Sequence, residues 1–273
     1  NISNGANPLI VSNFATNGFA KEVFIDTING SYYTFISDES KGLYIVNVSN
    51  PVSLLLDTNI SYPGVKSVSR KGNYVFTALT NGVVKVIDIS QLPNTVNEVA
   101  SYNAVNTVER VEVSGNVAYF VENVTGIEIV NASDPINLTQ YSTIKPPGNC
   151  YDIKIANDLI YVADGNAGVS VINASNPVQP YFISTLNTET NVKGIDYSPN
   201  FLFIAEGNLG VQVLNVFNPV YPDYVGYYEP GNHCYSINYF KAKVLVANGN
   251  GGLLILRFWF TFHFYRFNTL DTI

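Results

Sequence analysis

The stretch that decides the fold is Gly168-Val-Ser-Val-Ile-Asn-Ala-Ser-Asn-Pro177, because close copies of it recur along the chain. Each copy is rich in β-branched residues and closes on a proline, so it predicts a strand that runs into a turn. The first interval between the recurring prolines is 43 residues and each later one is 42: Pro8, Pro51, Pro93, Pro135, Pro177 and Pro219. A fixed period of this length is the signature of a repeat architecture.

The rest of each unit supplies further strands. In the fourth copy Tyr151-Asp-Ile-Lys-Ile-Ala156 alternates with period two, and the apolar run Leu159–Ala163 follows it. Asp164-Gly165 then predicts a hairpin turn, and Tyr181–Thr185 is a short strand after the proline. About four strands per unit, six units and no helical spacing predict an all-β, six-bladed β-propeller. A sandwich array and a β-solenoid are the alternatives.

The two ends of the chain complement each other. Asn7 to Ser12 looks like the post-proline strand of a unit whose earlier part is missing, and Tyr235 to Phe258 holds three strands of a unit that lacks its last. We therefore expect the N-terminal strand to complete the C-terminal blade and close the propeller. The predicted division is a propeller over residues 1–258, with repeats beginning near the six prolines, and an aromatic tail over residues 259–273.

The repeated phrase resembles the LVIVD repeat. Val84-Lys-Val-Ile-Asp88 comes near to the motif itself, and the resemblance extends from about residue 7 to residue 258. It implies a propeller of a kind common in secreted and cell-surface proteins, and it implies no reaction. The chain departs from the motif by carrying asparagine at the aspartate position in four copies: Asn47, Asn131, Asn173 and Asn215.

Composition limits the possible partners. Only 13% of the 273 residues are charged, so Asn, Ser, Thr and Tyr must cover much of the surface, as suits a secreted or glycosylated protein. The net charge of −7 argues against a nucleic-acid partner, and no apolar run approaches the ~20 residues of a membrane span. Because the chain starts at Asn1 and contains no methionine, we expect a processed or partial product.

Asn-X-Ser/Thr triplets suggest N-linked glycans. We expect Asn29 and Asn123, in hairpin loops, to be the better acceptors. Asn47, Asn131 and Asn173 share one repeat position, where a turn asparagine bonded to its own backbone is the competing interpretation. In a propeller their turns share one face with the turn of Asn29, so glycans there would leave the other face free for contacts. The eight triplets begin at Asn1, Asn29, Asn47, Asn59, Asn123, Asn131, Asn137 and Asn173.

Residues typical of catalysis and metal binding are few. Cys150 and Cys234 each stand 15 residues after a repeat proline, in different units, so we expect two buried free thiols rather than a disulfide. Val108 and Val192 hold the same repeat position. His233 directly precedes Cys234, which suggests a thiol–imidazole pair. Because neighbouring strand residues point to opposite faces, we expect the two side chains not to meet. Two acidic triplets, Asp164-Gly165-Asn166 and Glu206-Gly207-Asn208, could offer oxygens to calcium but are more typical of hairpin turns. We expect no metal and no cofactor.

The aromatic tail breaks with the preceding composition and is typical of a strand with one strongly apolar face. It could fold back on its own propeller as an extra strand, pair with a neighbouring subunit, or be a faulty chain end. Its candidate assembly residues are Phe258, Trp259, Phe260, Phe262, Phe264 and Phe267.

We expect a non-enzymatic extracellular or cell-surface interaction protein, such as a filament or sheath subunit, that self-associates through its termini or binds other surface proteins. The alternative is a ligand-binding, lectin-like or hydrolytic propeller with its site at the channel mouth. Convergent carboxylates or histidines at one mouth would favour the alternative, and an apolar contact strand favours the first interpretation.

Overall fold

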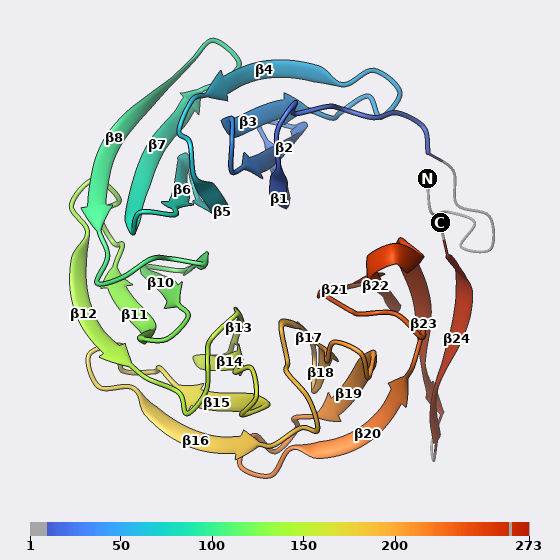
Figure 1. Ribbon diagram of the computed structural model, residues 1–273. Coiled ribbons are helices and arrows are strands. Elements are labelled where there is room, and N and C mark those ends of the chain that lie inside the picture. Colours follow the sequence, from blue (N-terminus) through green and yellow to red (C-terminus); the bar gives the residue numbers. More distant parts are fainter. Residues whose placement is uncertain (1–9, 262–263, 273) are drawn as a thin grey trace. The chain divides into compact units, whose positions relative to one another are not determined.

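The computed structural model describes residues 10–261 and 264–272, with side chains through residue 258. The fold is all-β: six antiparallel sheets of four strands each form the blades of a six-bladed β-propeller, as the repeat predicted (Figure 1). The described part also holds one 3₁₀ turn, η1 (Gly249–Gly251), and no helix long and apolar enough to span a membrane.

Residues 10–144 form one compact unit of three blades, the N-terminal unit. In every blade the strands pair in chain order, so each blade is one continuous segment of sequence. Its strands are β1 (Ala20–Ile28), β2 (Ser31–Asp38), β3 (Gly42–Asn47), β4 (Leu55–Ile60), β5 (Val65–Lys71), β6 (Tyr74–Leu79), β7 (Val83–Gln91), β8 (Thr95–Asn103), β9 (Arg110–Ser114), β10 (Val117–Glu122), β11 (Gly126–Asn131) and β12 (Thr139–Ile144).

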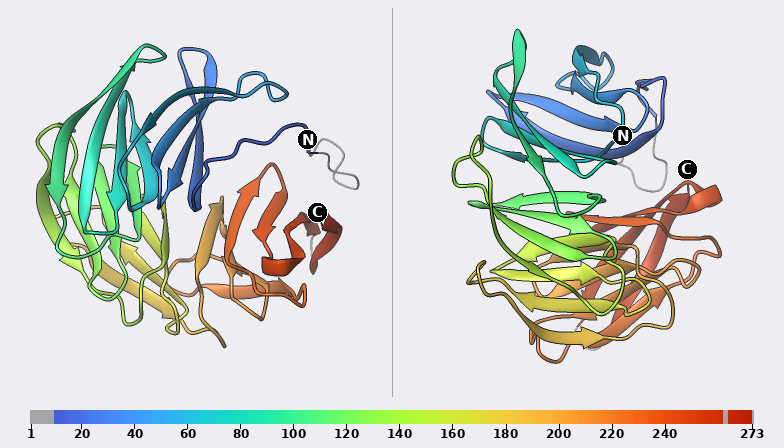
Figure 2. Two further views of the ribbon diagram at one scale, coloured as in Figure 1. Left: turned by 45° about the horizontal axis from the view of Figure 1, so that its top comes forward. Right: turned by 60° about the vertical axis from the view of Figure 1, so that its left-hand side comes forward.

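Residues from 145 onward belong to a second compact unit of three blades, the C-terminal unit. Its blades are coloured yellow-green to red in Figure 2. They repeat the same order of strands. They comprise β13 (Asp152–Ala156), β14 (Leu159–Ala163), β15 (Val169–Asn173), β16 (Tyr181–Leu186), β17 (Gly194–Ser198), β18 (Phe201–Ala205), β19 (Val211–Asn215), β20 (Asp223–Tyr228), β21 (Ser236–Phe240), β22 (Lys243–Ala247), β23 (Leu253–Thr261) and β24 (Phe264–Thr272).

The sequence period reappears in the backbone geometry. In every blade the pairing of the third and fourth strands shifts register at an equivalent position, such as Val171/Ile172 and Val213/Leu214, and the second blade has one further shift at Asp88/Gln91. The irregularity lies midway along the third strand, and such bulges increase the local twist of a sheet. The strictly kept period therefore specifies where each blade bends as well as where its strands lie.

The core of each unit lies between the faces of adjacent blades. In the C-terminal unit, Phe203 and Val213 of one blade pack with Val246 and Leu256 of the next, and all four are fully buried. In the middle blade of each unit the second and third strands are apolar on both faces because a neighbouring blade covers each face. This explains near-continuous apolar runs such as Phe201–Ala205, where simple alternation is absent.

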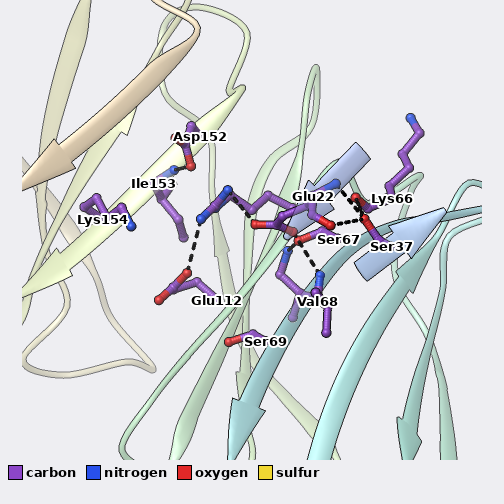
Figure 3. Close-up of polar contacts among 12 residues, drawn as sticks. Glu22, Ser37, Lys66, Ser67, Val68, Ser69, Glu112, Asp152, Ile153 and Lys154 are labelled. Atoms are coloured by element: carbon purple, nitrogen blue, oxygen red, sulfur yellow. Dashed lines mark hydrogen bonds and ion pairs between the residues drawn. The ribbon is translucent and has the colours of Figure 1, made fainter. Parts of the chain in front are cut away.

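Polar side chains on the first strands join neighbouring blades in the N-terminal unit (Figure 3). Glu22 Oε2 accepts a hydrogen bond from Val68 N at 2.9 Å, across the step from the first blade to the second. Ser67 Oγ accepts one from Val111 N at 3.1 Å, across the step from the second blade to the third. Each bond satisfies a buried or half-buried backbone donor on a strand that has no further strand beside it.

In the C-terminal unit, aspartates on the first strands make the hydrogen bonds between neighbouring blades. Asp152 Oδ2 accepts from Ile195 N at 3.1 Å, and Asp196 Oδ2 accepts from Tyr239 N at 2.6 Å. Lys154 also lies 3.4 Å from Asp196 Oδ1. These first-strand carboxylates therefore fix the blades against one another within the unit, and their chemistry is structural.

The expected closure by the N-terminal strand is not shown. Residues 1–9 lie outside the described residues, and Ile10 to Ser12 are not in a strand. The fourth position of the last blade is held by β24, which pairs with β23 along Leu254 to Thr261. The predicted boundary at residue 258 therefore falls inside β23. A strand next in sequence needs only a tight turn to pair, so the tail can fill this position locally.

Candidate functional site

A polar residue recurs every 42 positions at the turn between the second and third strands of each blade. We call this end of the blades the acid end, and the opposite end, with the Asn-Pro turns, the proline end. Five of the six side chains at this position are buried, although four of the six residues are acids. The six residues are Asp38, Thr80, Glu122, Asp164, Glu206 and Asn248.

These acids hold the loop that leads into the first strand of their blade. Asp164 Oδ1 accepts from Gly148 N at 3.1 Å, and Glu206 Oε1 accepts from Thr190 N at 2.8 Å. The triplets at Asp164 and Glu206 are therefore turn anchors, as the sequence favoured. Within the described residues, no three His, Cys, Asp or Glu side chains are grouped so that they could hold a metal ion.

The fourth and fifth blades differ in the residue six positions after the acid and in the second carboxylate oxygen of that acid. In the fourth blade Ser170 Oγ donates to Asp164 Oδ2 at 2.8 Å. In the fifth blade this position is Gln212, and Glu206 Oε2 is buried with no hydrogen-bond partner. Because a buried carboxylate oxygen without a donor is costly, Glu206 identifies a place where a donor is missing.

A pocket opens beside this place, at the acid end of the C-terminal unit. Its volume is about 420 Å³, and it lies between the segment that follows β16 and strands β19 and β20 of the next blade. Two carboxylates, two side-chain amides and two phenols supply most of its polar groups. The lining residues are Asn187, Thr188, Glu189, Leu209, Gln212, Tyr224, Tyr227 and Glu229.

The charged side chains that line the pocket are all negative. Burial raises the pKa of Tyr224, and Tyr227, Glu206, Glu229 and Glu189 raise that pKa further. Three carboxylates therefore act on one phenol, and no lysine, arginine or histidine is among the lining residues. The rings of Tyr224 and Tyr227 lie 6.5 Å apart between centroids, at 32° to each other. Both rings remain more than half exposed, so a ligand can reach their faces.

Sequence reasoning missed this pocket, although a signal for it was present. Counting back 42 residues from Gln212, Tyr224 and Tyr227 gives Ser170, Phe182 and Thr185 in the fourth blade. The fifth blade thus departs from its neighbour at all three positions. A departure from the repeat consensus that gathers on one face would have identified this blade as the place of a candidate site.

A second unusual group lies at the acid end of the N-terminal unit. Glu122 and Glu128 are both buried and hydrogen-bond to each other, and Glu128 also accepts from Tyr102 Oη at 2.5 Å and Val105 N at 3.0 Å. Burial, followed by the contribution of Glu122, raises the pKa of Glu128. The pair is enclosed by protein groups, so it is a titratable part of the core.

The predicted glycan acceptors fall into two groups. Asn29 is exposed in the β1–β2 turn with φ of 51°. Asn47, Asn131 and Asn173 are half-buried, and each Oδ1 accepts from the backbone N–H two residues later at 3.0 Å. These three asparagines therefore make the turn bonds that the competing interpretation required, and their Nδ2 atoms remain the acceptor nitrogens for a glycan.

The other triplets are more scattered. Asn59 Nδ2 donates to Lys41 O at 3.3 Å, and Asn137 Nδ2 donates to Asp134 Oδ2 at 2.7 Å. Asn123 is half-buried in the β10–β11 turn, and Asn1 lies outside the described residues. In the C-terminal unit the one triplet, at Asn173, is at the proline end, opposite the pocket.

The candidate assembly residues do not form one exposed surface. Phe258 is only 2% exposed, and its ring packs edge-on against Phe201 and Phe203 with centroids 5.4 and 5.1 Å away. Its side chain is therefore part of the core rather than a contact residue. Trp259, Phe260, Phe264 and Phe267 have backbone positions in β23 or β24, while their side chains and the whole of Phe262 lie outside the described residues.

The two thiols are free and buried, as predicted. Burial and the neighbouring Asp164 raise the pKa of Cys150 to about 12, and burial raises the pKa of Cys234 to about 11. His233 Nδ1 lies 2.9 Å from Asn208 Oδ1, whereas the sulfur of Cys234 faces Asn248 Oδ1 at 3.7 Å. The adjacent pair thus points to different partners, and His263 lies outside the described residues.

Comparison with known proteins identifies the repeat. The family model described as the LVIVD repeat matches residues 28–61, 64–104, 107–143 and 147–188, more than half of the chain. A search of curated proteins finds no match.

Solved structures share the fold at low identity. The computationally designed Ika8 protein has 10% identity and a TM-score of 0.64, over 88% of this chain and 71% of its own. The β-propeller domain of Cps50 (Swd1) from Myceliophteria thermophila has 11% identity and a TM-score of 0.73, over 90% of this chain and 84% of its own. The periplasmic gluconolactonase PpgL from Pseudomonas aeruginosa has 9% identity and a TM-score of 0.74, over 87% of this chain and 82% of its own. At these identities the likeness concerns the fold alone.

Proposed function

Because the chain belongs to the LVIVD-repeat family, we propose that it is a non-enzymatic recognition module that acts outside the cell or at its surface. Its six blades are the scaffold, and the pocket at the acid end of the C-terminal unit is the binding site. The pocket is the observation that carries this proposal. Its volume of about 420 Å³ lies in the range of small-molecule sites, and its walls combine two aromatic rings with a few polar groups.

The surface supports the extracellular part of the proposal. The chain has few charges and eight possible glycan acceptors, and the acceptor of the C-terminal unit lies at the end opposite the pocket. A glycan at Asn173 would therefore leave the pocket open.

The non-enzymatic part rests on the chemistry of the lining. Two glutamates, two amides, a threonine and two phenols can bind a polar ligand, but the lining contains no serine, cysteine or histidine. Those three residue types supply most nucleophile–base pairs. On this proposal Glu189 and Glu229 bind the ligand, which favours the ligand-binding alternative over a filament subunit.

A binding screen tests the proposal. The wild-type protein is screened by thermal shift against neutral sugars, amines and carboxylates, beside the double variant Tyr224→Ala/Tyr227→Ala. Tyr221→Ala is the matched control, because Tyr221 is exposed nearby and does not line the pocket. We expect at least one class to stabilise the wild type and the control but not the double variant. No stabilising class, equal stabilisation of all three proteins, or turnover of the bound compound would contradict the proposal.

Self-association is a second candidate, favoured by exposed aromatic side chains on both sides of the repeat proline Pro219 in the C-terminal unit. Phe217 is 78% exposed and Tyr221 is 73% exposed. Light scattering should then show a smaller assembly for Phe217→Ser/Tyr221→Ser than for the wild type. A wild-type protein that is monomeric at high concentration would remove this candidate. Deletion of residues 259–273 is a poorer test, because it removes β24 from its blade.

A further inference from the structure

We infer that this pocket takes an organic cation: a ligand or partner side chain that carries a primary ammonium or guanidinium group. The inference rests on the proposed function and adds the chemical class of the ligand. Three independent features of the described residues support it: the sign of the charge, an unoccupied buried acceptor, and the aromatic wall.

The charge selects against anions. Glu189 and Glu229 line the pocket, and Glu206 lies close enough to act on the same phenol of Tyr224. None of the lining residues is basic, so no group within the pocket neutralises these carboxylates. A cation gains charge-assisted hydrogen bonds here, which are about twice as strong as neutral ones.

The buried acceptor shows where a donor is missing. Glu206 is fully buried, its Oε1 is held by Thr190 N, and its Oε2 has no partner. In the preceding blade Ser170 fills the equivalent place, whereas Gln212 lines the pocket instead. Leu209 lines the pocket, and its N–H bonds to the backbone O of Glu206 at 3.0 Å, so the turn that carries Glu206 adjoins the pocket.

The aromatic wall suits a cation as well. A cation within about 6 Å of a ring centroid is attracted to the face of a tyrosine. The centroids of Tyr224 and Tyr227 are 6.5 Å apart, so one ammonium or guanidinium group can lie near both. The hydroxyl, amide and carboxylate groups around them can accept the remaining N–H donors.

A metal ion fits less well. Within the part of the chain that the structure describes, no three His, Cys, Asp or Glu side chains come close enough together to ligate one metal. Carboxylates spread around a pocket of about 420 Å³ match the several separated N–H groups of an organic cation better than a single small ion.

Calorimetric titration tests the inference, with agmatine and spermidine as cationic probes, D-mannose as the neutral probe and citrate as the anionic probe. The variant is Glu189→Gln/Glu229→Gln, which keeps the shape of two exposed side chains, so it should fold normally. Asp223→Asn is the matched control, because Asp223 is an exposed carboxylate on β20 that does not line the pocket. Circular dichroism melting checks that all three proteins are folded.

We expect both amines to bind the wild type and Asp223→Asn alike, and to bind the double glutamine variant about tenfold more weakly. Binding should also weaken as salt rises, since the rim carboxylates are exposed. Equal amine affinity in all three proteins overturns the inference. Binding of D-mannose but not the amines, lost in Tyr224→Ala/Tyr227→Ala, overturns the cation and keeps the proposed function. Failure of every probe overturns both.

Discussion

Replacing Phe258 with alanine separates a core residue from an assembly residue. Its ring is 2% exposed and meets Phe201 and Phe203 edge-on at centroid distances of 5.4 and 5.1 Å. Truncating a buried phenylalanine costs about 3–5 kcal/mol, because transfer free energy is lost and a cavity remains. With roughly 2–4 °C lost per kcal/mol in a chain of this size, Phe258→Ala should lower the melting temperature by about 10 °C.

Differential scanning calorimetry of the wild type, Phe258→Ala and Phe240→Ala measures this directly. Phe240 is the control, because it is 52% exposed in β21, the first strand of the same blade. Its truncation should change the unfolding free energy by no more than about 0.5 kcal/mol. The reasoning is refuted if both variants melt alike while light scattering shows that only Phe258→Ala loses an assembly, since Phe258 would then act at a contact surface.

Three further predictions follow from the described contacts. Because the pKa of Glu128 is raised in the folded protein, its contribution to stability is full below about pH 4.5 and is lost as pH rises through the folded pKa. The urea midpoint of Glu128→Gln should therefore fall less than that of the wild type between pH 4.5 and 8. An equal change of the midpoint with pH in both proteins would contradict this. Cys150 and Cys234, with pKa values raised to about 12 and about 11, should not react with a disulfide reagent at pH 8 until the chain is unfolded, and rapid labelling of the native protein would contradict their burial. Expressed through a glycosylating secretory pathway, the chain should carry a glycan at exposed Asn29, and an intact mass equal to the bare polypeptide would exclude the glycan hypothesis.

The period of 42 residues made the fold predictable, because it states the number of strands and of blades before any contact is known. It also located Cys150 at a valine-like site, since Val108 and Val192 at the same repeat position are buried too. The closing strand was not predictable in this way. Both Ile10 to Ser12 and the tail read as strands, and only the pairing of β24 with β23 distinguishes them.

The candidate site was harder to predict for a physical reason. A repeat reports what its units share, whereas a site arises where one unit differs. Glu206 looked like the turn anchors of the other blades, and its second oxygen has no donor in the blade where Gln212 stands at the position of Ser170. Glu189 and Glu229 meet the same pocket from the segments that follow β16 and β20, so only the packed blades bring them together.

Hydrogen-exchange mass spectrometry tests the binding site most directly, comparing the protein alone with the protein saturated by its tightest amine probe. The account predicts slower exchange in peptides covering residues 187–190 and 206–229, which hold the pocket and the loop bond to Glu206. Slower exchange confined to the proline end, or to the first strands around Glu22 and Asp152, with residues 206–229 unchanged, would place the ligand elsewhere and contradict it.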